Sequence, residues 1–154
     1  MRTKSNFTIE PADQTDAELL AAIHKECFPT YWNPDEFNNF FGVEGTHAFL
    51  VIKGETPVGM MVYRAQFEQA DIITIAVLPE HRKLGIARAM LEKSLAHMTK
   101  LGVETIFLDV EDGNQAAISL YEGYGFAYQR RRKLYYRQKD GSYTDALVMQ
   151  KKIA

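Results

Sequence analysis

The chain has very little cysteine: Cys27 is the only one in 154 residues, so no intrachain disulfide can form. A single thiol fits a reducing compartment. Cysteine and histidine nowhere have the spacing of a zinc site, and we expect no metal. The N-terminal residues lack the apolar core of a signal peptide, and no apolar run approaches the ~20 residues of a membrane span. We therefore expect a cytoplasmic protein with no membrane partner.

The chain also has little excess of charge of either sign, with 18 basic residues against 20 acidic ones. The net charge of −2 gives no overall attraction to DNA, and we expect no DNA partner. An apolar content of 46% and a charged content of 25% are ordinary for a soluble globular protein. The length suits one domain with a sizeable core. We expect a single domain over residues 1–154, as a monomer or a homodimer.

The first part of the chain predicts a short strand and two helices. Pro11 is expected to end the strand over residues 7–9, because proline has no N–H for a ladder. Thr15 to Glu18 resembles a capping box at the start of the first helix. Asn33, with Pro34 after it, predicts the start of the second helix.

The rest of the chain predicts six strands and two helices. Three apolar segments with short connections predict an antiparallel meander, and the last two strands pair around Asp140 and Gly141. The order β-α-α-β-β-β-α-β-α-β-β indicates an α/β fold: a mixed, mostly antiparallel seven-stranded sheet with helices on both faces and a central β-α-β unit. The six strands are expected over residues 48–52, 58–63, 69–78, 105–110, 126–136 and 143–149.

The turn inside the β-α-β unit has features of a phosphate-binding loop. Gly85 lets the backbone approach a ligand closely, and Ala87 keeps the helix start uncluttered. The first N–H groups of a helix lack internal partners and carry the positive end of its dipole. With Arg82 and Lys83 beside them, they suit a pyrophosphate. From these residues alone, an ordinary strand–helix turn is the alternative.

Two segments resemble the GNAT N-acetyltransferase superfamily. R-x-x-G-x-A at residues 82–87, after a hydrophobic strand and V-x-P, resembles its acetyl-CoA pyrophosphate loop. L-[DE]-V-x-x-x-N-x-x-A-x-x-L-Y-x-x-x-G-F at residues 108–126 matches a second, longer segment, and the element order agrees over essentially the whole chain. The resemblance implies acetyl-CoA as co-substrate, bound by Ile75, Val77, Arg82, Lys83, Leu84, Gly85, Ile86, Ala87, Asn114 and Tyr121.

By this resemblance, Tyr121 lies near the coenzyme sulfur and acts as general acid. The thiolate released when an amine attacks the thioester has a pKa near ~8.5 if it resembles cysteine, and tyrosine, at ~10, can donate a proton to it. We expect the Ile75–Val77 segment to splay from the Ile106–Val110 segment, admit the pantetheine and offer an N–H to the oxyanion. A packed core tyrosine and, for Asn114, a plain helix N-cap are the alternatives.

Asp109 stands where related bacterial N-terminal acetyltransferases often have glutamate. Its ordinary pKa of about 3.9 makes it a weak base. Three readings are open: it accepts a proton through a water, it orients the amine, or it is a solvated or ion-paired strand residue. A protein α-amine, with a pKa near ~7.7–8.0, tolerates a weak base better than a lysine amine near ~10.4.

Two further stretches resemble bacterial ribosomal-protein-alanine N-acetyltransferases: residues 26–37, which include Trp32, and the final hairpin with Tyr135 and Tyr136. This implies a protein N-terminus as acceptor, such as a ribosomal-protein alanine, with these three aromatics at its site. Aromatic core contacts and cross-strand aromatic pairing are the alternatives.

We expect direct acetyl transfer in a ternary complex, because Cys27 lacks an evident base that would make it a nucleophile. A small-molecule amine acetyltransferase, acting on a polyamine or an antibiotic, is one alternative function. A non-catalytic acyl-CoA-binding module is the other.

Overall fold

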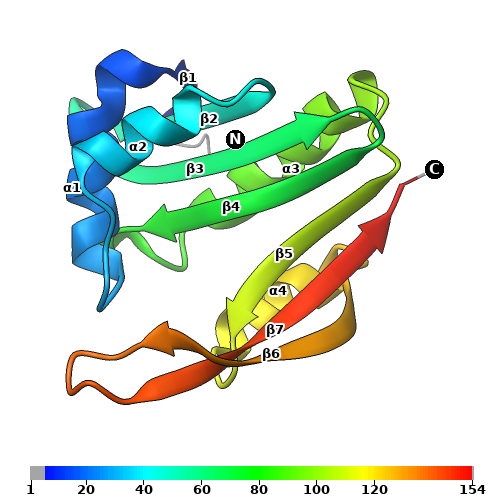
Figure 1. Cartoon of the computed structure of the whole chain (residues 1–154). Coiled ribbons are helices and arrows are strands. Elements are labelled where there is room, and N and C mark those ends of the chain that lie inside the picture. The colour runs from blue at the N-terminus through cyan, green and yellow to red at the C-terminus, as the bar shows by residue number, and fades with distance from the viewer. Residues whose placement is uncertain (1–5, 154) are drawn as a thin grey trace.

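The computed structural model describes residues 6–153, and seven strands form a single sheet in it (Figure 1). Residues 1–5 and 154, which the expected domain includes, lie outside this described part. The element order agrees with the prediction. The elements are β1 (Phe7–Ala12), α1 (Ala17–Cys27), α2 (Pro34–Phe41), β2 (Thr46–Lys53), β3 (Thr56–Gln66), β4 (Gln69–Val77), α3 (Ile86–Lys100), β5 (Thr105–Glu111), α4 (Gln115–Gly123), β6 (Ala127–Arg137) and β7 (Tyr143–Lys152), with short 3-10 turns at Gln14–Asp16 and Pro79–His81.

The strands lie in the order β1-β2-β3-β4-β5-β7-β6. Every neighbouring pair is antiparallel except β4 and β5, which are parallel and are joined through α3. This is the predicted central β-α-β unit, next to the predicted meander of β2, β3 and β4. The last strand, β7, lies between β5 and β6, so the final hairpin joins the sheet through its second strand.

Helices cover the sheet unevenly, and this decides where a ligand has access. Helices α3 and α4 pack on one face, where Leu91 and Met98 of α3 and Tyr121 of α4 join the larger core. Helices α1 and α2 pack on the other face, mainly against β2, β3 and β4, through Leu20 and Phe37. The same face of β5, β7 and β6 is left open, as Figure 1 shows in front of these strands.

The alternation of side chains along β5 defines that open face. Ile106, Leu108 and Val110 are buried beneath α3 and α4, whereas Phe107 and Asp109 between them are partly exposed on the opposite side. Side chains alternate across a strand, so Asp109 projects from the uncovered face of the sheet.

Two predictions at the N-terminal end are wrong. Pro11 lies inside β1, opposite Phe49, because β1 is an edge strand in which alternate N–H groups need no strand partner. The capping box is made by Asp13 and Asp16, two residues before the expected one, because the first turn is a 3-10 turn. The second helix starts as predicted: the Asn33 side chain accepts from the Glu36 N–H at 2.9 Å, and Glu36 accepts from the Asn33 N–H at 3.0 Å.

Candidate active site

Strands β4 and β5 separate partway along their length. They pair from Gln69 and Thr105 to Ile72 and Leu108, and no further. The register of β4 against β3 shifts there and leaves Ile73 as an extra residue, and such a bulge bends a strand. Figure 1 shows β4 and β5 diverging beyond this point. The predicted splay is therefore present, and its cause is a bulge that the sequence did not reveal.

The carbonyl of Val77, at the end of β4, anchors the residues around it. It accepts a hydrogen bond from Arg82 Nε at 2.9 Å and one from Cys27 Sγ at 3.4 Å. The first bond ties the Arg82 side chain to the end of β4 through Nε, and the guanidinium has four further N–H donors. Burial raises the pKa of the Cys27 thiol, which keeps it protonated and poorly nucleophilic.

The loop before α3 fits a pyrophosphate. Gly85 is the N-cap of α3 with φ +83°, and no side chain caps this helix. A Cβ built on Gly85 would meet nothing within 4 Å, so a ligand can approach the backbone there. Lys83 is also left-handed, with φ +65°. The unpaired first-turn N–H groups and two neighbouring cations suit an anion.

The other residues of this loop differ in exposure. Leu84 is exposed and Ala87 is half-buried, whereas the side chain of Ile86 is buried in the main core and fixes the start of α3. Any contact of Ile86 with a phosphate group therefore involves its backbone N–H. Asn114 is the N-cap of α4, where its Oδ1 accepts from the Ala117 N–H at 3.2 Å. The capping alternative is realised, and the amide NH₂ group of Asn114 has two donors besides.

Tyr121 is buried in the larger core with 5% of its surface exposed. Its ring lies edge-on to Phe126, with 5.8 Å between the ring centroids. Burial raises the pKa of Tyr121, because the phenolate would lose its solvation. The hydroxyl therefore keeps its proton throughout the neutral range, which both a core tyrosine and a general acid require.

Asp109 forms an ion pair on the open face of the sheet. Its Oδ1 accepts from Arg132 Nε at 3.2 Å, and the Arg132 guanidinium lies 5.6 Å from the centre of the Tyr135 ring. Burial, and then the negative charge of Asp109, raises the pKa of Tyr136; Tyr121 is also among the groups that influence it. Arg132 thus links Asp109 to Tyr135 on the open face, whereas Tyr121 packs in the core with α3 and α4.

An irregularity in β6 sets the two tyrosines side by side. Between the pairs Arg132–Ala146 and Tyr136–Thr144, three residues of β6 oppose Asp145 alone. Asp145 fastens this segment, since its Oδ1 accepts from the Leu134 N–H at 2.9 Å and its Oδ2 from Arg131 Nη1 at 2.9 Å. The rings of Tyr135 and Tyr136 lie 5.0 Å apart, nearly perpendicular. The aromatic partner is the chain neighbour, so the cross-strand alternative is wrong.

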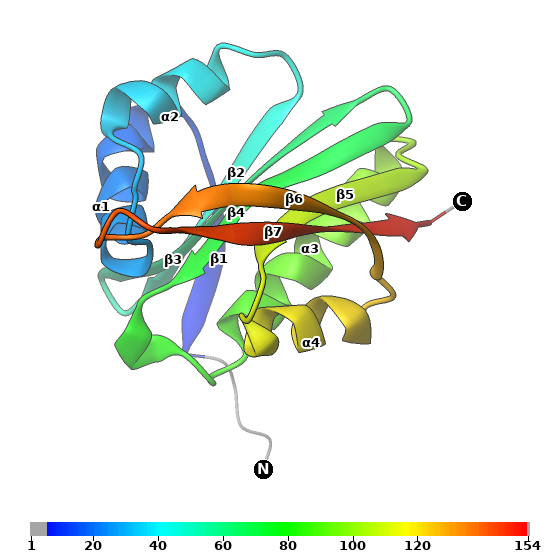
Figure 2. The same cartoon turned by 60° about the horizontal axis from the view of Figure 1, so that its bottom comes forward.

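Trp32 belongs to an aromatic cluster in the connection between α1 and α2. Its ring stacks on His24 with centroids 4.5 Å apart, and Phe37 and Phe40 meet it edge-on. The same connection reaches the final hairpin, because Thr30 Oγ1 donates to the Arg137 carbonyl at 3.0 Å. Figure 2 shows the tip of this hairpin beside α1. Sequence reasoning missed Thr30, because only the fold brings residues so distant in sequence together.

Between residues 6 and 153, no helix has the length and apolar character needed to cross a membrane. Within the same range, histidine, cysteine, aspartate and glutamate nowhere gather in threes as metal ligands would.

Known proteins resemble this chain in sequence and in fold. The model of the Acetyltransferase (GNAT) family matches residues 17–126. The chain is 34% identical to the [Ribosomal protein bS18]-alanine N-acetyltransferase of Escherichia coli (strain K12), over 92% of this chain and 95% of that protein.

Solved structures agree in fold. The crystal structure of the ribosomal-protein-S18-alanine N-acetyltransferase from Escherichia coli superposes with a TM-score of 0.89 and 29% identity, covering 96% of this chain and 94% of that one. Arabidopsis thaliana NAA60 in complex with acetyl-CoA superposes with a TM-score of 0.82 over 96% and 98% of the two chains; at 21% identity it shows the fold alone. The chain therefore belongs to the GNAT acetyltransferase family and is an N-acetyltransferase that uses acetyl-CoA.

Proposed function

We propose that this enzyme acetylates the α-amine of a protein N-terminus, such as that of a ribosomal-protein alanine. The observation that carries the proposal is the open face of β5, β7 and β6, which lies beside the Tyr135–Tyr136 pair and offers a polypeptide a path along the hairpin. A polyamine would favour a deep acidic pocket instead. The similarity to an alanine N-acetyltransferase supports the same acceptor, because an alanine residue has no side-chain amine.

In this proposal, the acetyl donor spans the two sides of the splay. Arg82, Lys83 and the backbone of residues 84–87 bind its pyrophosphate at the uncapped start of α3. The segment from Ile75 to Val77 and the amide of Asn114 border its pantetheine. Beyond Ile72, β5 no longer pairs with β4, so alternate N–H groups of Ile75–Val77 on that edge have no strand partner among the described residues. One of them donates to the oxyanion.

Tyr121 is the proposed general acid. The acceptor amine attacks the thioester carbonyl carbon, the carbon–sulfur bond breaks, and the Tyr121 hydroxyl gives its proton to the leaving thiolate. Asp109, paired with Arg132, either orients the amine or takes its proton through a water. Trp32, Tyr135 and Tyr136 line the path of the acceptor chain.

We also propose that residues 1–154 form one catalytic domain, and that a ribosomal-protein acceptor places the enzyme in the cytoplasm.

Thiol release from acetyl-CoA tests this proposal, with three sets of acceptors: peptides with free N-termini, N-terminally blocked peptides that contain lysine, and polyamines. We expect turnover on the free N-termini. Tyr121→Phe should lower kcat roughly 10²-fold or more and leave the Kd for acetyl-CoA unchanged. Tyr128→Phe removes the same hydroxyl from an exposed position on β6 and should behave as wild type.

Turnover confined to polyamines or other small amines would contradict the acceptor. Acetyl-CoA binding without turnover on any amine would contradict catalysis. An undiminished kcat in Tyr121→Phe would remove that residue from the mechanism.

A further inference from the structure

Asp71 places a second carboxylate at the mouth of the splay. Its partner on β5 is Phe107, one pair before the ladder ends at Ile72 and Leu108. Partners in a ladder share a face, so Asp71 lies on the same open face as Phe107 and Asp109. Asp109 is its diagonal neighbour, and strand spacing and rise put their Cα atoms about 8 Å apart.

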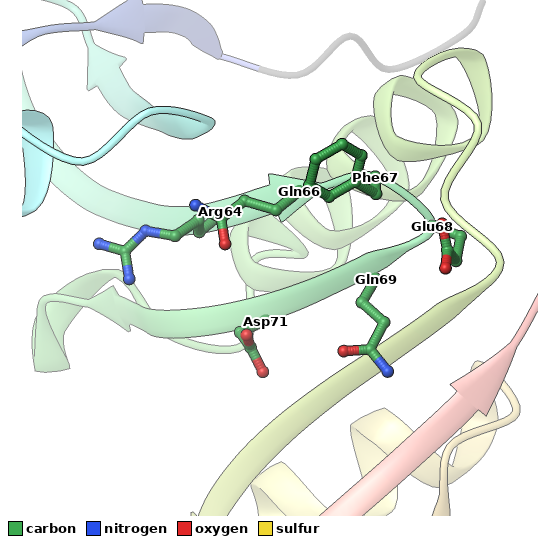
Figure 3. Close-up of a pocket in the computed structure, with 6 residues that line it drawn as sticks. All are labelled: Arg64, Gln66, Phe67, Glu68, Gln69 and Asp71. Atoms are coloured by element: carbon green, nitrogen blue, oxygen red, sulfur yellow. The ribbon is translucent and has the colours of Figure 1, made fainter.

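Asp71 also lines a cavity on this face. The cavity has a volume of about 230 Å³ and is bordered by residues 64 and 66–69 as well as by Asp71. Figure 3 shows the Asp71 side chain extending from β4 toward β5, while Arg64 extends away along β3. Arg64 Nε donates to Thr46 Oγ1 at 3.0 Å, which holds this guanidinium on the β2 side. A cation on a ligand can therefore approach Asp71.

The two carboxylates differ in their partners. Asp109 is paired with Arg132, with 3.2 Å between its Oδ1 and Arg132 Nε. Between residues 6 and 153, ion pairs are made by Arg131 and Arg132, and Asp71 takes part in none of them. Burial raises the pKa of Asp71; Arg64 and Arg132 oppose this, and Asp109 adds to it. Of the two carboxylates, Asp71 is thus the one that has no ion-pair partner among the described residues, and an ammonium group on a ligand can supply one.

We propose that Asp71 binds the protonated acceptor amine at the mouth of the splay and takes its proton, while the Asp109–Arg132 pair positions the acceptor. The inference rests on the proposed function, because it needs an amine on the open face. The ammonium gives one proton to Asp71 Oδ, which passes it to solvent through the cavity. The freed lone pair attacks the thioester carbonyl, the carbon–sulfur bond breaks, and Tyr121 protonates the thiolate. The nitrogen loses its second proton as the intermediate collapses, and that proton replaces the one that Tyr121 gave.

The test is the pH dependence of kcat/KM for Asp71→Asn, measured with a free-N-terminal peptide from pH 6.5 to pH 9. At pH 6.5 the α-amine is mostly protonated, and we expect a loss of roughly 10²-fold. The loss should shrink to a few-fold at pH 9, because an amine with a pKa near ~7.7–8.0 is then neutral without help. Glu55→Gln removes the same charge from the exposed turn between β2 and β3, away from the cavity, and should match wild type. Asp71→Glu should restore part of the activity at pH 6.5.

A loss that is the same at every pH would overturn the inference, since a merely structural role gives that result. So would wild-type rates in Asp71→Asn, or the pH-dependent loss appearing in Asp109→Asn instead. Thermal unfolding and acetyl-CoA titration of Asp71→Asn separate these results from misfolding. If the wild type accepts only small amines, the proposed function fails, and the same series with that amine decides the role of Asp71. If no amine is accepted, both fail.

Discussion

At the scale of single residues, several polar side chains take their properties from burial. The Tyr121 ring packs in the core while its hydroxyl stays protonated, and the thiol of Cys27 is inert for the same reason. His24 is the clearest case. It lies between Phe28 and Trp32, with ring centroids at 4.4 and 4.5 Å, and its Nδ1 accepts the Trp32 backbone N–H at 3.1 Å. Burial lowers the pKa of His24 to about 4, so the folded protein holds the ring neutral.

His24 should make the stability depend on pH. In the unfolded chain the His24 ring has an ordinary pKa near 6.5 and binds a proton below that pH. In the folded chain the ring binds this proton only near pH 4. Stability is therefore lost as the pH falls through this window, by roughly 2 kcal/mol between pH 7 and pH 5. Urea unfolding at the two pH values measures it. His24→Asn keeps an acceptor for the Trp32 N–H and should flatten the dependence by that amount; equal slopes in both proteins would contradict the assignment.

At the scale of elements, two irregularities build the site. The bulge at Ile73 turns β4 away from β5, and the extra residues of β6 bring Tyr135 beside Tyr136. Both depend on how a strand pairs with a neighbour from another part of the chain, so local composition carries no signal for them. Gly85 and Asn33 could be predicted because a left-handed turn and a helix cap depend on the residue itself.

The two glycines that flank α3 allow a controlled test of the phosphate loop. Gly85 and Gly102 have φ of +83° and +87°, and a Cβ at either would meet nothing within 4 Å. Alanine at either should destabilise the fold by a similar ~1–2 kcal/mol. Only Gly85→Ala should weaken acetyl-CoA binding, by about tenfold, because its methyl group lies where the ligand approaches. Calorimetric titration measures the Kd for acetyl-CoA, and thermal unfolding measures the loss of stability. Equal Kd values for the two variants would place the pyrophosphate elsewhere.

At the scale of the whole molecule, the sheet has two halves that share only a short parallel ladder from Gln69 to Ile72. A ligand in the splay would contact both halves. Acetyl-CoA at 100 times its Kd should stabilise the fold by about 2.7 kcal/mol. For a domain of this size, that corresponds to a rise in Tm of roughly 5–10 °C. Hydrogen exchange should slow most at residues 73–77 and in the first turn of α3, and uniform protection would contradict a ligand held in the splay.

The element order was predictable because turn residues and apolar patterns are local. The prediction that Pro11 ends the first strand was wrong because proline interrupts an internal strand, whereas β1 lies at the edge of the sheet. The position of β7 between β5 and β6 is a property of the assembled sheet. The family segments around Gly85 and Tyr121 could be read from sequence. Thr30 and Asp145 acquire their hydrogen-bond partners, and Asp71 its place in the cavity, only through the fold.

The most direct test of the proposed acceptor uses one peptide that begins with alanine and contains an internal lysine. After incubation with acetyl-CoA and the enzyme, fragment mass spectrometry locates the acetyl group. We predict that it lies on the N-terminal nitrogen, and that a copy of the peptide with a blocked N-terminus stays unmodified. Acetyl on the lysine side chain, with the blocked peptide modified equally well, would contradict the account.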